Sequence, residues 1–379
     1  MGIDEARERL DRIDDEMVEL FLERMGIADD VARYKVENGK PLTDPARERE
    51  ILARVTEASG DMEAYTHRLY TTLFQLSKSR QSRLMSDSES PVRQQVERGL
   101  ARGGDVFPRS GMIAVQGNEG AYSQMAAEKI LPRGNIVFVK SFEAVFDAVS
   151  SGLCTFGILP VENSSAGSVR KVYDLLQKRE FSIVRSTRVY IRHELLAKPG
   201  TKLEDIREIH SHEQAIGQCS KFLAGLVNVK VVSVDNTATA AKAISESDDP
   251  SIAAIASHSA AELYGLEVLS SDIQDSDNNY TRFICITKEP TIYAGANHIS
   301  LVIDTANTPG ALYDVLSDIA ALGVNMSKLE SVPVSGSNFE FIFFIDLEAS
   351  VQEPGVMELL ENLERTSELF LMLGNYQEV

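Results

Sequence analysis

A chain of 379 residues exceeds what one hydrophobic core usually holds, and at roughly 100 to 200 residues per domain we expect three domains. Hydrophobic residues make up 43% and charged residues 25%, as in globular proteins, and no apolar run approaches the roughly 18 residues of a membrane span. The net charge of -19 argues against nucleic acid as a partner, and it means that an acidic ligand needs a locally basic pocket.

The start of the sequence contains no apolar signal core, which predicts a cytoplasmic protein. The three cysteines lie far apart, in or beside apolar segments, a pattern typical of reduced and mostly buried thiols. They are Cys154, Cys219 and Cys285. His210 and His212 share one face of a predicted strand, but no further ligand lies at metal-binding spacing. We therefore expect neither a disulfide framework nor a metal site.

Residues 1–85 are predicted to form an all-helical domain. Apolar residues recur at helical spacing over Ile13–Tyr34, which predicts a helix of about thirty residues. A helix this long needs a long partner, from a bundle or from a second chain. A second helix begins near Pro45, because Asp44 is a good N-cap and proline suits the first helical position. A third helix spans about Ala64–Leu84.

The cations on these helices indicate an anionic ligand. At about 100° per residue, Arg24 and Lys35 project within about 20° of each other and can reach one pocket. Arg7 projects about 100° away, so it would serve a different pocket, such as that of a symmetry mate. Spacing alone leaves open a solvated helix bundle with ion pairs between successive turns.

With these features, residues 4–84 resemble the all-helical chorismate mutases. The positions that carry the resemblance are Arg7, Arg24, Lys35, Asp44, Arg47, Glu48, Ser77 and Gln81. The resemblance implies an intertwined dimer, with Arg7 crossing into the partner's site. It implies that the three arginines bind the carboxylates of chorismate, that Lys35 and Gln81 donate to its ether oxygen, and that Glu48 holds its hydroxyl. Asp44 is equally well explained as the helix cap. The rearrangement to prephenate needs such positioning and charge stabilisation, but no general base.

Residues 86–110 are predicted to be a linker with one short helix, and residues 111–287 an α/β domain. The order strand, helix, buried strand and polar turn occurs twice, over Val137–Ser165 and Val231–Ser259, which makes two similar lobes the expected architecture. Ligands usually bind between such lobes, at the carboxyl ends of the strands. Strands are expected at Ile113–Gln116, Ile136–Val139, Phe156–Leu159, Ile183–Tyr190, Glu208–His210, Val229–Val234, Ile252–Ile255 and Phe283–Ile286.

Polar segments lie at the ends of several of these strands. They are Gly117–Ser123, Glu162–Ser165, Ser211–Gln214 and Asn279–Phe283. Gathered in one cleft, their amides, hydroxyls and backbone donors suit a small ligand that bears carboxylates. Structural explanations remain open as well: Ser211 with Gln214 matches a capping box, and Gly117 and Gly120 can serve only to admit a tight turn.

The whole α/β block resembles the prephenate dehydratases. The matching motifs are Gly117-x-x-Gly120-x-Tyr122-Ser123, Pro160-Val161-Glu162-Asn163-Ser164, Ser211-His212-x-Gln214-Ala215-x-x-Gln218-Cys219 and Asn279-x-Thr281-Arg282-Phe283. The resemblance implies a two-lobed domain like a periplasmic binding protein. It also implies a site between the lobes that converts prephenate to phenylpyruvate with loss of water and carbon dioxide.

The resemblance assigns roles within this cleft. Thr281 is the expected hydrogen-bond donor to the departing ring hydroxyl, and no cofactor is needed because the substrate is primed to aromatise. Arg282 either pairs with a substrate carboxylate or fixes the strand of Thr281. The residues expected to position the substrate are Asn163, Ser164, Ser211 and Gln218. Glu213 stands where relatives commonly have proline, and we expect it on the surface.

Residues 297–379 are predicted to follow the βαββαβ order of ferredoxin-like domains. The expected elements are strand Ile299–Ile303, helix Ala311–Leu322, strands Asn325–Ser331 and Phe339–Leu347, helix Val356–Thr366 and strand Leu369–Leu373. The helix start after Thr308-Pro309 offers free backbone N–H groups, a natural site for a carboxylate.

This last segment resembles the ACT regulatory domains that follow prephenate dehydratases, through Gly310-Ala311-Leu312 and Glu330-Ser331-Val332-Pro333. The resemblance implies that phenylalanine binds between two chains and inhibits the enzyme. The implied ligand residues are Gly310, Ala311, Leu312, Asn325, Glu330 and Ser331. Relatives typically carry arginine in place of Val332, so weaker or altered feedback control is one expectation. The alternative is a purely structural dimerisation domain.

Together the resemblances predict a bifunctional chorismate mutase and prephenate dehydratase, as a homodimer or higher even-numbered homo-oligomer with phenylalanine as effector. Three alternatives stay open: one decayed active site, a preference of the dehydratase for arogenate, or a non-catalytic amino-acid sensor. Retention of both the mutase cations and Thr281 argues against the sensor, because binding alone would not require both sets.

Overall fold

The computed structural model describes all residues except 1, 42–43, 86–89, 309 and 334–340. Pro309 and Phe339, the first residue of one predicted strand, therefore lie outside the described residues. The chain divides into two compact units. One comprises residues 1–94, 304–323 and 354–369, and the other residues 95–303, 324–353 and 370–379.

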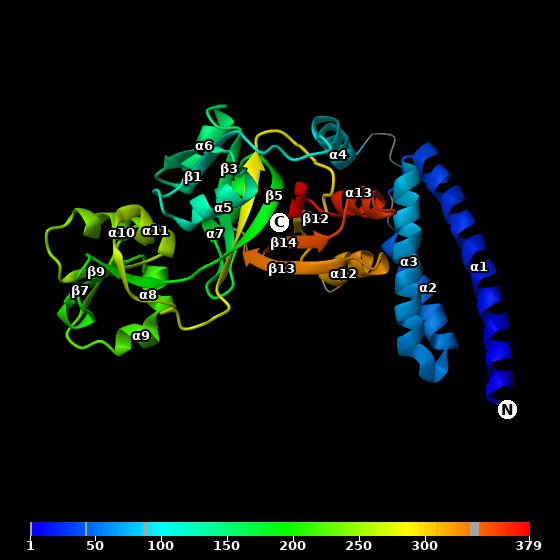
Figure 1. Ribbon diagram of the computed structural model, residues 1–379. Helices are drawn as coiled ribbons and strands as arrows, with labels where there is room; N and C mark the ends of the chain where they lie inside the picture. Colours follow the sequence, from blue (N-terminus) through cyan, green and yellow to red (C-terminus); the bar gives the residue numbers. More distant parts are fainter. Residues whose placement is uncertain (1, 42–43, 86–89, 309, 334–340) are drawn as a thin grey trace. The chain divides into compact units, whose positions relative to one another are not determined.

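The first unit is helical, as the N-terminal sequence predicts. Its helices are α1 (Ile3–Glu37), α2 (Pro45–Ala58), α3 (Glu63–Met85), α12 (Ala311–Ala321) and α13 (Val356–Thr366) (Figure 1). Asp44 caps α2, since its carboxylate accepts a hydrogen bond from the backbone N–H of Arg47 at 3.1 Å. The buried residues of α1, Met25, Ala28 and Ala32, all lie in its second half. The apolar side chains of the first half of α1 are therefore not buried against other described parts of this chain.

The second unit contains two α/β lobes. The first lobe has strands β1 (Met112–Gln116), β2 (Asn135–Val139), β3 (Phe156–Asn163), β4 (Gly167–Ser168), β5 (Ser182–Tyr190) and β11 (Tyr280–Thr287). Helices α5 (Tyr122–Ile130), α6 (Phe142–Ser150) and α7 (Arg170–Lys178) accompany them, and α4 (Pro91–Arg102) precedes β1. Strands β2, β1 and β3 are parallel, and β11 lies antiparallel between β3 and β5. The α/β prediction is confirmed.

The second lobe has a five-stranded sheet of its own. Its strands follow the order β10 (Glu267–Ser270), β6 (Glu194–Ala197), β9 (Ile252–Ala256), β7 (Glu208–Ser211) and β8 (Lys230–Ser233). Its helices are α8 (Glu213–Gln218), α9 (Ser220–Ala224), α10 (Thr237–Glu246) and α11 (His258–Tyr264). The repeated strand, helix and strand order is confirmed, with Ser141 and Asn236 as equivalent N-caps. Strands β6 and β10 were not predicted from the sequence, because each has only four residues.

The C-terminal strands continue the sheet of the first lobe. They are β12 (His298–Asp304), β13 (Asn325–Pro333), β14 (Phe341–Glu348) and β15 (Phe370–Glu378), in the order β13-β14-β12-β15. Strand β15 runs past Leu373, where the prediction ends it, because its last residues pair with β5 in parallel, Gln377 with Arg185 and Glu378 with Ser186. Ten strands of the described part of the chain thus share one sheet, and these four belong to the same compact unit as the lobes.

Candidate active sites

A cleft of about 320 Å³ separates the two lobes of the second unit. This volume suits a small metabolite. The first lobe contributes Gly117, Tyr122, Ser123, Asn163, His193 and Thr281, and the second contributes His212, Gln214, Gln218 and Asn236. The structure therefore brings together members of all four polar segments singled out in the sequence. Gly120, in the middle of the first of these segments, has φ +88°, a conformation that favours glycine.

The buried side chain of Asn163 has its amide orientation fixed by the backbone. Its Oδ1 accepts hydrogen bonds from the N–H groups of Ser165 and Ala166 at 3.0 and 2.9 Å. Because backbone N–H groups only donate, this atom must be the oxygen. The Nδ2 group of Asn163 therefore faces Thr281 and donates to its Oγ1 at 2.9 Å.

This orientation decides what Thr281 can offer. Its hydroxyl oxygen already accepts from Asn163, and among the described residues none accepts a hydrogen bond from the hydroxyl proton. Thr281 lines the cleft, so its proton can be donated to a bound ligand. The site thus presents an uncharged donor with a fixed polarity.

The same hydrogen-bond chain extends to a residue that the sequence analysis missed. Gln218 donates through Nε2 to Asn163 Oδ1 at 3.1 Å, so its Oε1 is an acceptor. His193 lies 2.8 Å from this Oε1 through its own Nε2, which must carry the proton. Burial lowers the pKa of His193 below its ordinary value, and the hydrogen bond with Gln218 opposes this shift. His193 follows the end of β5, which pairs with the start of β11, and no motif in the sequence marks it.

The cleft holds no activated thiol. Cys219 is buried beside Gln218, and burial raises the pKa of its thiol to about 12. All three cysteines are free and buried, as predicted. The chemistry of the cleft therefore rests on hydrogen bonds, with no thiolate available at neutral pH.

Two predicted substrate-positioning serines lie elsewhere. Ser211 is fully buried and donates to the carbonyl of Ile255 at 2.7 Å, so it joins β7 to β9. The capping-box interpretation of Ser211 is also wrong, because His212 caps α8 instead. Ser164 donates to the carbonyl of Asn278 at 2.7 Å and accepts from the N–H of Tyr280 at 2.9 Å, which fixes the approach to β11.

Arg282 lies on the face of β11 opposite Thr281, because side chains of a strand alternate between faces. Its guanidinium pairs with Asp346 at 2.5 Å and Glu378 at 3.1 Å. Of the two expectations for Arg282, the structure favours fixing the strand over pairing with a substrate carboxylate. Glu213 is exposed, as expected.

Four of the predicted mutase residues come together between α1 and α3. Arg24 donates to Ser77 Oγ and, at 3.1 Å, to the carbonyl of Leu73. Lys35 donates to Gln81 Oε1 at 2.9 Å, so the amide N–H₂ of Gln81 can point to a ligand. Ser77 and Gln81 are both buried. The shared direction predicted for Arg24 and Lys35 is confirmed.

The other mutase residues sit at the margin of this group. Glu48 pairs at 3.4 Å with Lys78, a residue that the sequence analysis missed although it lies between Ser77 and Gln81. Arg47 pairs with Glu50 at the surface. Arg7 pairs with Asp4, and its side chain is 70% exposed. At 1.5 Å per residue, Arg7 lies about 25 Å along α1 from Arg24, too far to serve the same pocket.

The predicted effector residues fall on two elements. Gly310, with φ +93°, precedes α12, which begins with Ala311 and Leu312. Asn325, Glu330 and Ser331 lie on β13. Glu330 accepts hydrogen bonds from Ser168 and Lys328, and the pKa of its carboxyl is lowered because these contacts outweigh the effect of burial.

Among the described residues, no group of three or more histidine, cysteine or acidic side chains is arranged to hold a metal ion. No helix in the described part of the chain combines the length and the apolar character that crossing a membrane requires.

Comparisons with known proteins agree with this geometry. The family model for prephenate dehydratase matches residues 113–291, and that for chorismate mutase type II matches residues 6–82. Arogenate dehydratase/prephenate dehydratase 2 of Arabidopsis thaliana is 38% identical over 276 residues, which cover 70% of this chain and 72% of the plant protein. The chain belongs to the prephenate dehydratase family.

Within this family, a bifunctional relative matches nearly the whole chain. The bifunctional chorismate mutase/prephenate dehydratase of Escherichia coli K12 is 29% identical over 376 residues, which cover 98% of this chain and 95% of the relative. With both family models matched, the chain carries chorismate mutase and prephenate dehydratase activities and acts in phenylalanine biosynthesis.

Two solved structures are similar to the dehydratase region. The prephenate dehydratase of Arthrobacter aurescens, in complex with L-Phe, has a TM-score of 0.64 at 30% identity and covers 70% of this chain and 89% of its own. A structure described as GqqA, a quorum-quenching acylase, has the same TM-score at 34% identity and covers 71% of this chain and 98% of its own. These likenesses support the two-lobed α/β architecture.

Proposed function

We propose that the interlobe cleft dehydrates prephenate with Thr281 as the hydrogen-bond donor to the departing ring hydroxyl. The observation that carries this proposal is the fixed polarity of the chain from His193 through Gln218 and Asn163, which leaves the Thr281 proton directed to a ligand. A donor already in place needs no reorganisation when charge develops on the leaving oxygen.

The dehydration requires few further contributions from the protein. The C–O bond to the ring hydroxyl breaks, the hydroxide leaves and takes a proton from solvent to become water, and the ring carboxylate leaves as carbon dioxide. The electron pair of its C–C bond completes the aromatic ring. Thr281 stabilises the departing oxygen, while Gln218 and Asn163 hold Thr281 in place. Gain of aromaticity supplies the driving force, so the residues need to orient the substrate more than to activate it.

For the mutase step, the proposed site lies between α1 and α3. Arg24 and Arg47 bind carboxylates, Lys35 and Gln81 donate to the ether oxygen, and Glu48 holds the hydroxyl. Arg7 acts in the site of a second protomer. Its distance along α1 supports this arrangement, as do the apolar side chains exposed on the first half of that helix. Those side chains include Leu10, Met17 and Leu20, which are 57%, 51% and 65% exposed.

The C-terminal segment is the proposed phenylalanine-responsive ACT domain. Its element order and its strand order β13-β14-β12-β15 are those of a ferredoxin-like fold. The left-handed Gly310 before α12 supports a carboxylate site at that helix start. The Arthrobacter relative was solved with L-Phe, which supports phenylalanine as the effector here.

Feeding chorismate alone to the purified chain tests the whole proposal. We expect prephenate to appear first and phenylpyruvate to follow without any added enzyme, and we expect phenylalanine to slow the second product. Both compounds can be followed by chromatography of timed samples. Prephenate that accumulates without further conversion would count against the assignment of the cleft.

Arogenate is the second candidate substrate, because the Arabidopsis relative bears that name as well. Arogenate carries an ammonium where prephenate has a keto oxygen, and the cleft lining includes Asp235, whose carboxylate suits a cation. The mutase on the same chain produces prephenate, which favours prephenate. The ratio of kcat/KM for the two substrates decides, and replacing Asp235 with asparagine should lower only the value for arogenate.

Replacing His193 with leucine is expected to lower kcat for dehydration about tenfold, because Gln218 Oε1 loses its shorter hydrogen bond and keeps only that from Asn279 Nδ2 at 3.1 Å. The side-chain amide nitrogen of glutamine lies the same number of bonds from Cα as Nε2 of histidine, and it also carries an N–H. His193→Gln should therefore recover most of the rate. Steady-state kinetics with prephenate measures both. An equal loss in the two variants would reduce His193 to a packing role, and the mutase rate serves as the internal control.

A further inference from the structure

The ladder between β11 and β3 carries two neighbouring residue pairs. Thr281 lies opposite Asn163, and Arg282 lies opposite Glu162. Next to them the register shifts, so that Phe283 lies opposite Pro160 and Val161 is the extra residue of a bulge. The first pair has its side chains in the cleft, and the second has them on the opposite face of the same sheet. Whatever holds the second pair also sets the backbone of the first.

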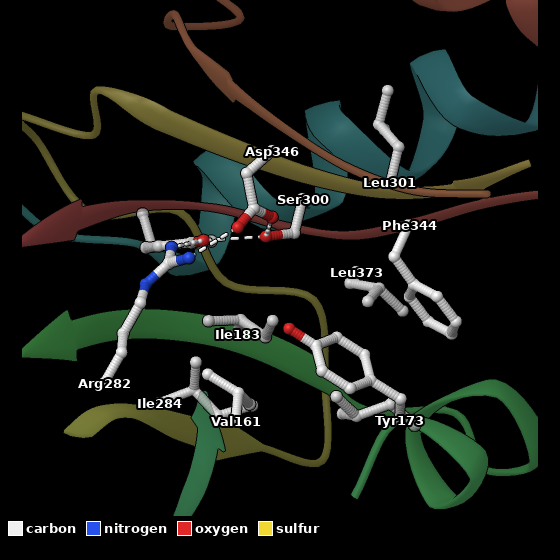
Figure 2. Close-up of a pocket in the computed structure, with 12 residues that line it drawn as sticks. Val161, Tyr173, Ile183, Arg282, Ile284, Ser300, Leu301, Phe344, Asp346 and Leu373 are labelled. Atoms are coloured by element: carbon white, nitrogen blue, oxygen red, sulfur yellow. Dashed lines mark hydrogen bonds and ion pairs between the residues drawn. The ribbon is translucent and has the colours of Figure 1, made fainter. Parts of the chain in front are cut away.

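Arg282 is held by groups from the C-terminal strands. Its side chain is 11% exposed, and that of its partner Asp346 is 8% exposed. The distance from Arg282 Nη1 to Asp346 Oδ2 is 2.5 Å. The other Nη of Arg282 donates to Tyr376 Oη at 2.7 Å. Ser300 donates to Asp346, and Figure 2 shows the three side chains of Arg282, Asp346 and Ser300 pointing toward one another. The space left between them and the surrounding apolar residues is about 10 Å³, so this is a packed contact and no ligand site.

Glu162 is likewise held by a residue of the C-terminal strands, in this case by a cation. Lys328 on β13 lies 3.5 Å from its carboxylate, and the Lys328 side chain is only 8% exposed. Lys328 also donates to Ser168 Oγ at 2.8 Å, on the short strand β4 that pairs with β3. Its ammonium lies 4.8 Å from the ring of Tyr173. Thus an anion from β14 holds Arg282, and a cation from β13 holds Glu162.

We propose that Asp346 and Lys328 are positioning residues for the dehydration step, which fix Thr281 and Asn163 from behind the sheet. This inference rests on the proposed role of Thr281. Arg282 is mostly buried among Asp346, Glu378 and Tyr376, so a shift of β11 would disturb several charged contacts at once in a poorly solvated place. A shift of β3 would in the same way draw Glu162 away from the buried Lys328 ammonium. The C-terminal strands therefore take part in the geometry of the cleft although they supply none of its lining residues named above.

Replacing Asp346 with asparagine keeps the shape of the side chain and removes its charge. We expect kcat for dehydration of prephenate to fall about tenfold, with KM changed less than about twofold, because the donor is misplaced while the rest of the cleft is intact. Lys328→Met, at a less enclosed pair, should show the same pattern with a smaller fall. Thermal unfolding followed by circular dichroism shows whether each variant is folded.

Gln377→Leu is the matched control. Gln377 accepts a hydrogen bond from Arg185 at 3.0 Å, so it also joins a C-terminal strand to the sheet of the first lobe. Arg185 pairs with Cys285 in the ladder, away from Thr281. Removing this contact should leave kcat within about twofold of the unchanged chain. A loss as large as that of Asp346→Asn would overturn the proposal in favour of general destabilisation.

A double-mutant cycle with Thr281→Val separates positioning from structure. If Asp346 acts through Thr281, Asp346→Asn should cost little once the hydroxyl is gone. The same tenfold fall in both backgrounds would overturn the inference. Full dehydratase activity of Thr281→Val by itself would instead refute the proposed role of Thr281, so the two failures are distinguishable.

Discussion

Replacing Thr281 with valine is expected to lower the rate of dehydration by about 10² to 10³-fold, the range seen when one preorganised donor to a developing oxyanion is removed. Valine keeps the branched shape, so the strand and the cleft should be preserved. What disappears is the donor directed to the ligand and the acceptor for Asn163. Timed conversion of prephenate to phenylpyruvate measures the effect.

Three comparisons sharpen this experiment. Thr281→Ser retains the hydroxyl and should keep most of the rate. Thr287→Val removes a hydroxyl from the other end of the same strand and should change the rate less than about twofold, as surface substitutions usually do. The mutase rate of Thr281→Val should be unchanged, because that site lies in the other compact unit. Near-normal dehydration by Thr281→Val would remove this residue from the catalytic group.

Replacing Lys35 with methionine should lower the mutase rate by a comparable factor, about 10² to 10³-fold. Methionine fills much of the same volume but cannot donate to the ether oxygen, and it also leaves Gln81 Oε1 without its donor at 2.9 Å. Dehydration of supplied prephenate should not change. Disappearance of chorismate, followed by absorbance, measures the first step.

Lys40→Met is the control for the loss of a lysine, because Lys40 is exposed just beyond the end of α1. Its mutase rate should match that of the unchanged chain. Mixing Arg7→Ala chains with Lys35→Met chains tests whether Arg7 acts in a second protomer. If each chain supplies its Arg7 to the site of its partner, one site of the mixed dimer contains both substitutions and the other contains the native Arg7 and Lys35. Activity should therefore return. No recovery in a verified mixed dimer would contradict the exchange.

Much of the architecture follows from local sequence signals. The cap formed by Asp44 and Pro45 gives the start of α2, and helical spacing places Arg24 and Lys35 on one face, where α3 meets them. Most strands of the two lobes, though not β4, β6 and β10, were predicted where apolar runs end in polar turns. These features depend on residues close together in the chain, which is why a single sequence reveals them.

Other features depend on the tertiary fold. Neighbours in a sequence motif face opposite ways on a strand, so Thr281 and Arg282 share a motif but serve different faces of the sheet. Ser211 lies in a polar turn, yet its hydroxyl donates its hydrogen bond to the carbonyl of Ile255 on the neighbouring strand β9. His193 belongs to no motif and reaches the site only because β5 and β11 are paired. Strand alternation decides the first of these features, and strand pairing, which joins distant segments, decides the other two.

The pairing of β15 with β5 bears on attempts to make a feedback-insensitive enzyme by truncation. Deleting the C-terminal strands would uncover β5 as an open sheet edge, and exposed edges pair readily with other chains. It would also strip Arg185, Arg188 and Arg282 of their partners on β14 and β15. A shortened protein should therefore tend to aggregate, and a production strain would be served better by point substitutions around Gly310 that leave every strand in place.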